Sequence, residues 1–305
     1  MVNWTSLAVL AVLLAICLAT TNFSIHVDEH FAVQFATTAG VALTAHYAFS
    51  MRWIRLSYIL GVMALFTWLS IIAADLSFIV ASLNLPLQDR NLANLDRILG
   101  LDWQAYQAYV YAHPSLIPYL DYGYNCLVTW PALVIPIALS LAHQHVRLQQ
   151  FVFASILMIV LIVLVSAVVP AMGTYYEYGI APDLSKLNPS GYVAQIDRLP
   201  LVRDGSLRLF NSTSIGGIIA FPSLHAAIPV LSCWALWTFR WIRPLVVTCS
   251  ADILFATPLF GGHYFIDVFA GILVAAASIC AALQVAQLSV RSTSGSNVLT
   301  QSATV

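Results

Sequence analysis

The feature that most constrains the fold is a series of long apolar runs with almost no charge in them. Residues 150–172 form one such run, and no Asp, Glu, Lys or Arg interrupts it. A helix of about 20 apolar residues is long enough to cross the hydrocarbon core of a bilayer. Hydrophobic residues make up 60% of the 305 residues and charged residues only 8%, whereas a soluble domain carries about 25% charged residues. The sequence therefore predicts an all-α, polytopic membrane protein built as a helical bundle.

We expect about eight transmembrane helices. Residues 5–22 could be a signal peptide, but no Lys or Arg precedes them, which favours a retained first helix. The other expected spans cover residues 32–50, 57–81, 120–141, 150–172, 222–240, 244–260 and 264–288. Leucines between residues 92 and 101 recur at helical spacing inside the polar stretch 82–119, which indicates an amphipathic helix on the membrane interface.

Three segments are expected along the chain. Residues 1–55 hold two N-terminal transmembrane helices, residues 56–288 form a membrane-embedded catalytic domain, and the Ser/Thr-rich residues 289–305 form a disordered cytoplasmic tail. The short loops on one side are basic and contain no Asp or Glu; their arginines are Arg52, Arg55, Arg147, Arg240, Arg243 and Arg291. By the positive-inside rule that side is cytoplasmic. Both termini would then be cytoplasmic, and the long loops would face the periplasm or a lumen.

Two histidines and one aspartate stand where apolar runs begin on the predicted outer side. His225 lies near the start of the sixth span, and His263 and Asp267 lie at the start of the eighth. From His225 the chain runs inward for about 14 residues, roughly 21 Å of helix, and returns by a similar distance, so the two histidines reach one depth. Asp267 follows His263 by four residues, on the same helix face. Ionisable groups at membrane depth are costly unless paired or functional, so these residues predict a site.

The chemistry of this set points to phosphoryl transfer. Asp267 can accept a hydrogen bond from the imidazole of His263, which fixes the tautomer and leaves the other ring nitrogen free as a nucleophile. His225 can then protonate the leaving oxygen. Gly262 lets the backbone approach an anion, and Ser223 opens a helix whose N–H groups suit phosphate.

Other site types fit less well. Residues 26–30 (His-Val-Asp-Glu-His) match the pattern of inverted zinc peptidases. The loop is short, however, and Glu177, the only other glutamate, is not in a helical setting that could supply the third ligand. We therefore expect a polar turn there. The five cysteines lie in or beside apolar runs without the spacing of a zinc site, and are expected to be packing residues. The net charge of −1 offers no basic surface for nucleic acid.

Two strings resemble motifs of a known family. Phe-Pro-Ser-Leu-His at 221–225 and His-Tyr-Phe-Ile-Asp at 263–267 look like the second and third motifs of the type 2 phosphatidic acid phosphatase superfamily, and specifically of its inositol phosphorylceramide synthase (inositolphosphotransferase) branch. Residues 194–199 and 96–103 also resemble that branch, and the likeness covers about residues 89–288. It implies a phosphatidic acid phosphatase-like core, no metal and no other cofactor.

The resemblance assigns roles by position. His263 would be the nucleophile, Asp267 its orienting carboxylate, His225 the acid and base, and Ser223 a phosphate-binding hydroxyl. The better-known phosphatases begin the third motif with Ser-Arg, where this chain has Ala256 and Thr257. Their first motif has a Lys and an Arg-Pro, and neither is found in the corresponding loop. Other basic residues must then meet the phosphate charge; Arg198 and Arg203 are the expected ones, chosen over Arg90, Arg97 and Arg208.

Two carboxylates inside predicted spans complete the candidate list. Asp75, in the outer third of its span, is expected to bind substrate in a headgroup cavity, whereas Asp252, near mid-membrane, is expected to pair with a neighbouring helix. The sequence thus predicts a phosphotransferase that acts on phospholipid or sphingolipid substrates within the bilayer through a phosphohistidine. If water is the acceptor, the same residues make a lipid phosphate phosphatase. A proton-coupled transporter is the non-enzyme alternative, and the oligomeric state is not predicted.

Overall fold

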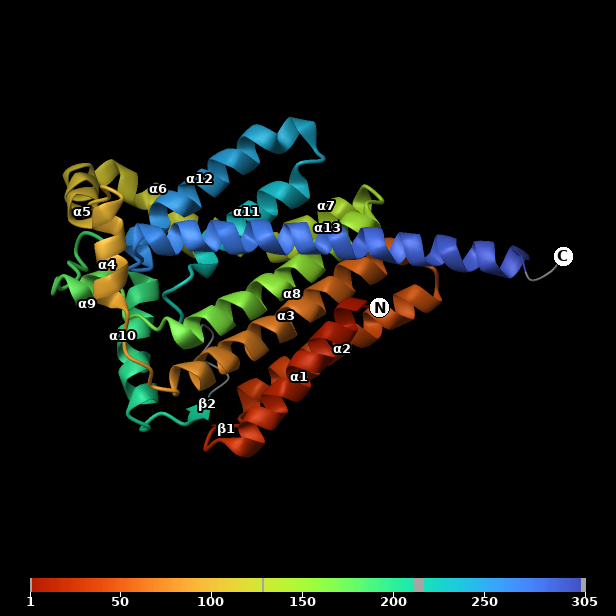
Figure 1. Cartoon of the computed structure of the whole chain (residues 1–305), viewed down its shortest axis with the longest axis horizontal. Coiled ribbons are helices and arrows are strands. Elements are labelled where there is room, and N and C mark those ends of the chain that lie inside the picture. The colour runs from red at the N-terminus through yellow and green to blue at the C-terminus, as the bar shows by residue number, and fades with distance from the viewer. Residues whose placement is uncertain (1, 128, 211–216, 303–305) are drawn as a thin grey trace.

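The computed structural model describes residues 2–127, 129–210 and 217–302, and its long helices lie side by side in a bundle (Figure 1). These helices are α1 (Val2–Thr20), α2 (Glu29–Ser50), α3 (Ile54–Ala81), α7 (Pro131–Leu141), α8 (His145–Val168), α11 (Leu224–Leu236), α12 (Arg243–Phe260) and α13 (Phe265–Ser302). Apolar side chains from α3, α8 and α11 form the main core, among them Leu65, Leu69, Ile162 and Leu231. The predicted all-α membrane bundle is confirmed.

Short helices gather at the end of the bundle opposite both chain termini (Figure 1). They are α4 (Asp89–Ile98), α5 (Trp103–Ala112), η1 (Pro114–Leu116), α6 (Ile117–Tyr122), η2 (Gly123–Leu127, a π-helix), α9 (Thr174–Glu177) and α10 (Ser190–Arg203), while η3 (Arg240–Ile242) precedes α12. Two strands of two residues each, β1 (Ser24–Ile25) and β2 (Leu209–Phe210), pair in parallel.

The predicted count of eight spans is higher than the structure supports. In the described part of the chain, five helices are long and apolar enough to cross a membrane, namely Asn3–Thr20, Ile54–Ala81, His145–Val168, Arg240–Phe260 and Phe265–Leu288. A sixth is possible if Pro114–Cys126 and Pro131–Leu141, bent by 68°, count as one span. Helix α11 has only 13 residues, and α2 is too polar, with several Thr, Gln and His residues.

The interfacial helix predicted around residues 92–101 corresponds to α4, which begins at Asp89. Its Leu95, Ile98 and Leu99 are exposed and can face lipid, whereas Asp89 and Asp96 point inward and are buried. At the N-terminus, Asp28 caps α2 by accepting a hydrogen bond from the Phe31 N–H at 2.7 Å. The polar turn expected at residues 26–30 is therefore the entry to a helix.

Helices α2 and α3 meet near the first predicted segment boundary. A turn separates α2 from α3 close to residue 55, yet α1 and α2 both pack against α3. At the other end, α13 continues to Ser302. No proline interrupts residues 289–302, so the backbone can extend the helix; residues 303–305 lie outside the described residues.

Two arginines bind carbonyls at the C-terminal end of α11, the end opposite His225. Arg147 donates from Nε to the Ala235 carbonyl at 3.0 Å and from Nη2 to the Trp234 carbonyl. Arg243 donates from Nε to the Trp237 carbonyl at 2.7 Å. The last carbonyls of a helix lack intrahelical partners, and cations are favourable beside them.

Candidate active site

His263 lies in the short turn between α12 and α13. Gly261 and Gly262 precede it, and Gly262 has a φ of 63°, a left-handed conformation that glycine adopts without strain. His263 Nδ1 lies 3.2 Å from Oδ2 of Asp267, four residues later, as the spacing predicts. The Tyr264 N–H donates to the same Oδ2 at 3.0 Å. When the proton is on Nδ1, Nε2 of His263 carries the free lone pair.

The His263–Asp267 pair is shielded from solvent. The side chains are buried, with 4% of His263 and none of Asp267 exposed. Burial lowers the pKa of His263 to about 4, since the charged imidazolium loses its hydration. The imidazole is consequently neutral near pH 7, which is the state that a nitrogen nucleophile requires.

The start of α11 is tied to this pair. Ser223 caps α11 by accepting from the Ala226 N–H at 3.3 Å, and its Oγ lies 3.3 Å from Nε2 of His263. The Ser223 N–H donates to the Asp267 carbonyl at 3.1 Å. Gly271 of α13 permits this approach, because a Cβ there would meet the Ser223 carbonyl and lie 3.1 Å from the Ala226 Cβ.

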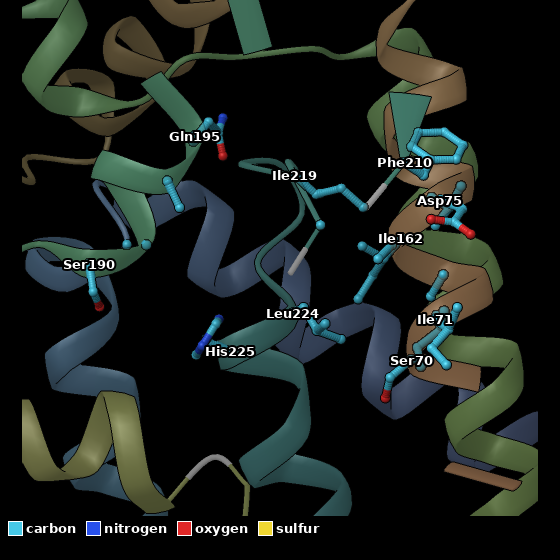
Figure 2. A pocket seen from close by; sticks show the side chains of 18 of the residues that line it. Ser70, Ile71, Asp75, Ile162, Ser190, Gln195, Phe210, Ile219, Leu224 and His225 are labelled. Carbon is cyan, nitrogen blue, oxygen red and sulfur yellow. The ribbon is translucent and has the colours of Figure 1, made fainter. Parts of the chain in front are cut away.

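A cavity of about 640 Å³ adjoins the two histidines, a volume typical of small-ligand sites. His225 and His263 both line it, so the structure brings the predicted pair together. Asp75 lines it from α3, and Figure 2 shows Asp75 across the cavity from His225 and Ser190. The other polar side chains in the lining are Gln34, Thr67, Ser70, Tyr124 and Gln195.

The cavity carries no cationic side chain within the described ranges: its lining includes no Lys or Arg. Arg198 and Arg203, the two expected phosphate contacts, belong to α10 but lie outside the lining. Arg203 instead donates to the Leu85 carbonyl at 2.9 Å. Ser223 and Gly262 also lie outside the lining, although Gly261 is part of it. These placements give the predicted phosphate contacts of both arginines no support.

Asp96 of α4 holds the turn that carries the nucleophile. It is fully buried, and its two oxygens accept hydrogen bonds from the N–H groups of Phe265 and Ile266, at 2.8 Å each. These N–H groups open α13, so Asp96 satisfies donors that a helix start leaves unpaired. Burial raises the pKa of Asp96, and the two N–H groups oppose that shift.

Asp89 lies two helical turns before Asp96 on the same face of α4 and binds the neighbouring loop. Its carboxylate accepts from the N–H groups of Met172 and Gly173, at 2.9 Å and 2.7 Å, and from the Tyr264 hydroxyl at 3.0 Å. The Thr174 N–H in turn donates to the Gly262 carbonyl at 2.8 Å. Sequence reasoning missed Asp89 and Asp96; their spacing of seven residues, on the face opposite the exposed Leu95 and Ile98, was the available signal.

Asp252, the remaining candidate, is not part of the cavity lining. Asp252 packs against Gly123, where a Cβ would meet its carboxylate. Across the residues that the structure describes, no group of three His, Cys, Asp or Glu side chains could hold a metal ion.

Comparison with known protein families matches residues 90–281 to the PAP2 superfamily, that is, the type 2 phosphatidic acid phosphatases. The matched region is more than half of the chain and contains both histidines and Asp267. No curated protein matches the chain, and no solved structure does. The match identifies the superfamily, not a branch within it. The chain therefore belongs to the type 2 phosphatidic acid phosphatase superfamily and is an integral membrane enzyme of the phosphatase or phosphotransferase kind, acting on lipid phosphates.

Proposed function

We propose that this enzyme transfers a phosphorylated headgroup from a membrane phospholipid to a lipid hydroxyl, in the manner of an inositolphosphotransferase. The observation that carries the proposal is the buried His263–Asp267 pair, whose histidine lines the same cavity as His225. A neutral imidazole oriented by a carboxylate is a competent nucleophile, and a second histidine can move the proton.

In the first step, Nε2 of His263 attacks the phosphorus of the donor. The P–N bond forms as the P–O bond to the departing diacylglycerol breaks. His225, which gains a proton when the anionic donor binds beside it, gives that proton to the departing oxygen. Asp267 stabilises the imidazolium character that develops on His263, because Nδ1–H already donates to it. The Ser223 hydroxyl, 3.3 Å from Nε2 in the resting site, is released to donate to a phosphoryl oxygen.

In the second step, His225 takes the proton from the acceptor hydroxyl, and the acceptor oxygen attacks the phosphorus. The P–N bond breaks and His263 is restored as a neutral base. A sphingolipid alcohol is the acceptor that we propose. With water as the acceptor, the same residues would perform hydrolysis, which is the phosphatase alternative.

The charge of the cavity favours a phosphodiester donor over a phosphomonoester. A monoester has a second pKa near 6 and carries about −1.5 to −2 charges at pH 7, whereas a diester carries one. The described cavity lining holds no Lys or Arg and includes the carboxylate of Asp75. Each uncompensated charge in such a place is costly, so the singly charged headgroup fits better.

Asp75 is the group that we propose to bind the donor headgroup. Within the described residues its carboxylate has no hydrogen-bond partner, and it lies across the cavity from His225 (Figure 2). A carboxylate only accepts hydrogen bonds when ionised. It therefore suits the hydroxyls of a polyol headgroup such as inositol.

We also propose that the cavity opens to the periplasm or a lumen. Both termini then lie in the cytoplasm when the bent pair Pro114–Cys126 and Pro131–Leu141 counts as a sixth span, because an even number of spans returns the chain to the side where it started. The support is the basic side of the bundle, where Arg147 and Arg243 bind the carbonyls that end α11. Short basic loops are retained in the cytoplasm. A cysteine introduced at Ser190, on the cavity side, should react with an impermeant thiol reagent from outside the cell; labelling only from the cytoplasm would contradict this orientation.

The proposed activity can be tested with purified protein in liposomes. Phosphatidylinositol, phosphatidylglycerol and phosphatidic acid, each labelled in the phosphate, would be supplied in turn with ceramide as the acceptor. We expect label to move from a diester donor to ceramide and phosphatidic acid to react poorly. Release of inorganic phosphate from phosphatidic acid, faster than any transfer to ceramide, would establish the phosphatase alternative instead.

A further inference from the structure

The oxygens of a transferring phosphoryl group need hydrogen-bond donors aimed at them. In this superfamily member the described cavity lining has no Lys or Arg to provide them. Neutral donors must therefore take that role, and a buried tyrosine beside His225 is in place to do so.

Tyr124 belongs to the π-helix η2, and its ring stacks on His225, with ring centroids 4.1 Å apart and planes 8° from parallel. The Tyr124 ring also stacks on Phe260, at 5.8 Å between centroids. Only 3% of Tyr124 is exposed, yet it lines the cavity. Within the described ranges, its hydroxyl makes no hydrogen bond. A buried tyrosine hydroxyl usually has a hydrogen-bond partner, so this hydroxyl is free to donate to a ligand in the cavity.

The hydroxyl lies against the first turn of α10, a helix of 14 residues that starts at Ser190. Pro189 precedes that helix and makes no side-chain cap, so the N–H groups of Gly191 and Tyr192 lack acceptors among the described residues. Ser190 and Gly191 both line the cavity. Free N–H groups at a helix start, with the positive end of the helix dipole, attract anions.

Gly191 brings these donors together with the nucleophile. A Cβ at this position would meet the Tyr124 hydroxyl, would lie 3.0 Å from the Tyr124 Cζ and would lie 3.2 Å from the Gly261 Cα. Gly261 is two residues before His263 and also lines the cavity. The tyrosine hydroxyl, the start of α10 and the His263 turn thus converge on one spot.

We infer that the Tyr124 hydroxyl and the first turn of α10 form the subsite that holds the non-bridging oxygens of the transferring phosphoryl group. The inference rests on the proposed function and deepens it, because it names neutral donors for a role that a Lys or Arg in the lining would otherwise fill. All of these donors are neutral, which matches a singly charged phosphodiester. The ring of Tyr124 also sets the plane of His225, so one residue serves both the phosphoryl oxygens and the acid.

Tyr124→Phe tests the subsite, because it keeps the ring that stacks on His225 and removes only the hydroxyl. Tyr122→Phe is the matched control, since Tyr122 precedes η2 directly and is 57% exposed. Two readouts are needed: kcat for transfer from the best diester donor, and the thermal stabilisation that orthovanadate, a mimic of the transferring phosphoryl group, confers on the purified protein.

We expect Tyr124→Phe to lower kcat on the order of 10²-fold, as loss of one oxyanion donor does. Vanadate should bind it about tenfold to a hundredfold more weakly, the loss expected for one hydrogen bond to a charged group. Tyr122→Phe should match the unaltered protein in both readouts. Gly191→Ala, which places a methyl group against the Tyr124 hydroxyl, should weaken vanadate binding in the same direction.

The outcomes separate the subsite from the proposed function. If the unaltered protein transfers phosphate and binds vanadate, but Tyr124→Phe equals it in kcat and in vanadate affinity, the subsite is refuted and the function stands. If the unaltered protein shows neither transfer nor vanadate stabilisation, the proposed function fails and the subsite falls with it. An equal loss in Tyr122→Phe would also overturn the assignment to the Tyr124 hydroxyl.

Discussion

Asp96→Ala should release the turn that carries His263. In the folded protein the two carboxylate oxygens accept from the Phe265 and Ile266 N–H groups, both at 2.8 Å, in a fully buried place. A buried donor left without an acceptor costs about 1–3 kcal/mol, so losing both acceptors costs about 2–6 kcal/mol. Part of that cost can be relieved if the start of α13 shifts, which would displace His263 from its reactive position.

The assay is kcat for headgroup transfer together with thermal unfolding of the purified protein. A displacement of about 1 Å at a reacting group can lower the rate about 10²-fold, and a loss of that size in kcat is the expected result. Asp96→Asn should recover part of the activity, because its amide oxygen can still accept one of the two hydrogen bonds.

Asp102→Ala is the matched control. Asp102 also caps a helix, accepting from the Ala105 N–H at 2.9 Å, but it is exposed and caps α5 rather than α13. Loss of such a cap costs about 1 kcal/mol, with kcat unchanged. The positioning role of Asp96 would be refuted if Asp96→Ala kept full kcat, or if Asp102→Ala lost as much activity.

Further predictions concern the nucleophile, the headgroup and the packing of the site. Asp267→Asn should lower kcat by up to ~10⁴-fold with folding preserved, since the amide cannot hold His263 in the reactive tautomer; near-normal single-turnover rates would argue against this role. Because burial lowers the pKa of His263 to about 4, kcat/KM should fall on acidification only as pH drops through about 4, and a protonation limb from His263 at 6.5 would contradict a buried neutral nucleophile. Asp75→Asn should raise KM for a polyol-headed donor about tenfold or more through loss of a charged hydrogen bond, and an equal KM would remove Asp75 from the headgroup site. Gly271→Ala should lower the free energy of unfolding by about 1–3 kcal/mol, because the new Cβ meets the Ser223 carbonyl; an unchanged melting temperature in differential scanning calorimetry would contradict this packing.

The bundle and the central pair could be predicted because both depend on local sequence. Long apolar runs set the helices, and the four-residue spacing of His263 and Asp267 brings their side chains to 3.2 Å, although His263 lies in the turn before α13 and not on the helix. The hairpin of two short apolar helices then returns His263 beside His225, and both line one cavity. The number of spans was harder to predict, because α11 and the bent segment around Pro131 are helical without being straight spans.

The partners that complete the site come from far along the chain, and single-sequence patterns do not connect them. Asp96 contacts residues 169 and 170 positions later, and Tyr124 stacks on His225 from another helix. Positive charge in the sequence indicates Arg198 and Arg203 as phosphate contacts, but both lie outside the cavity lining. Residue type alone does not identify a tyrosine hydroxyl or unpaired backbone N–H groups as phosphate contacts.

Direct detection of the covalent intermediate tests the central claim, that His263 is the phosphoryl acceptor in the first step. The purified protein would be mixed briefly with a labelled diester phospholipid, quenched at alkaline pH where phosphohistidine survives, and mapped by peptide mass spectrometry. The account predicts a phosphorylated headgroup on His263 that is absent from His263→Ala. Full transfer activity in the His263→Ala variant, or an adduct on a residue other than His263, would contradict this claim.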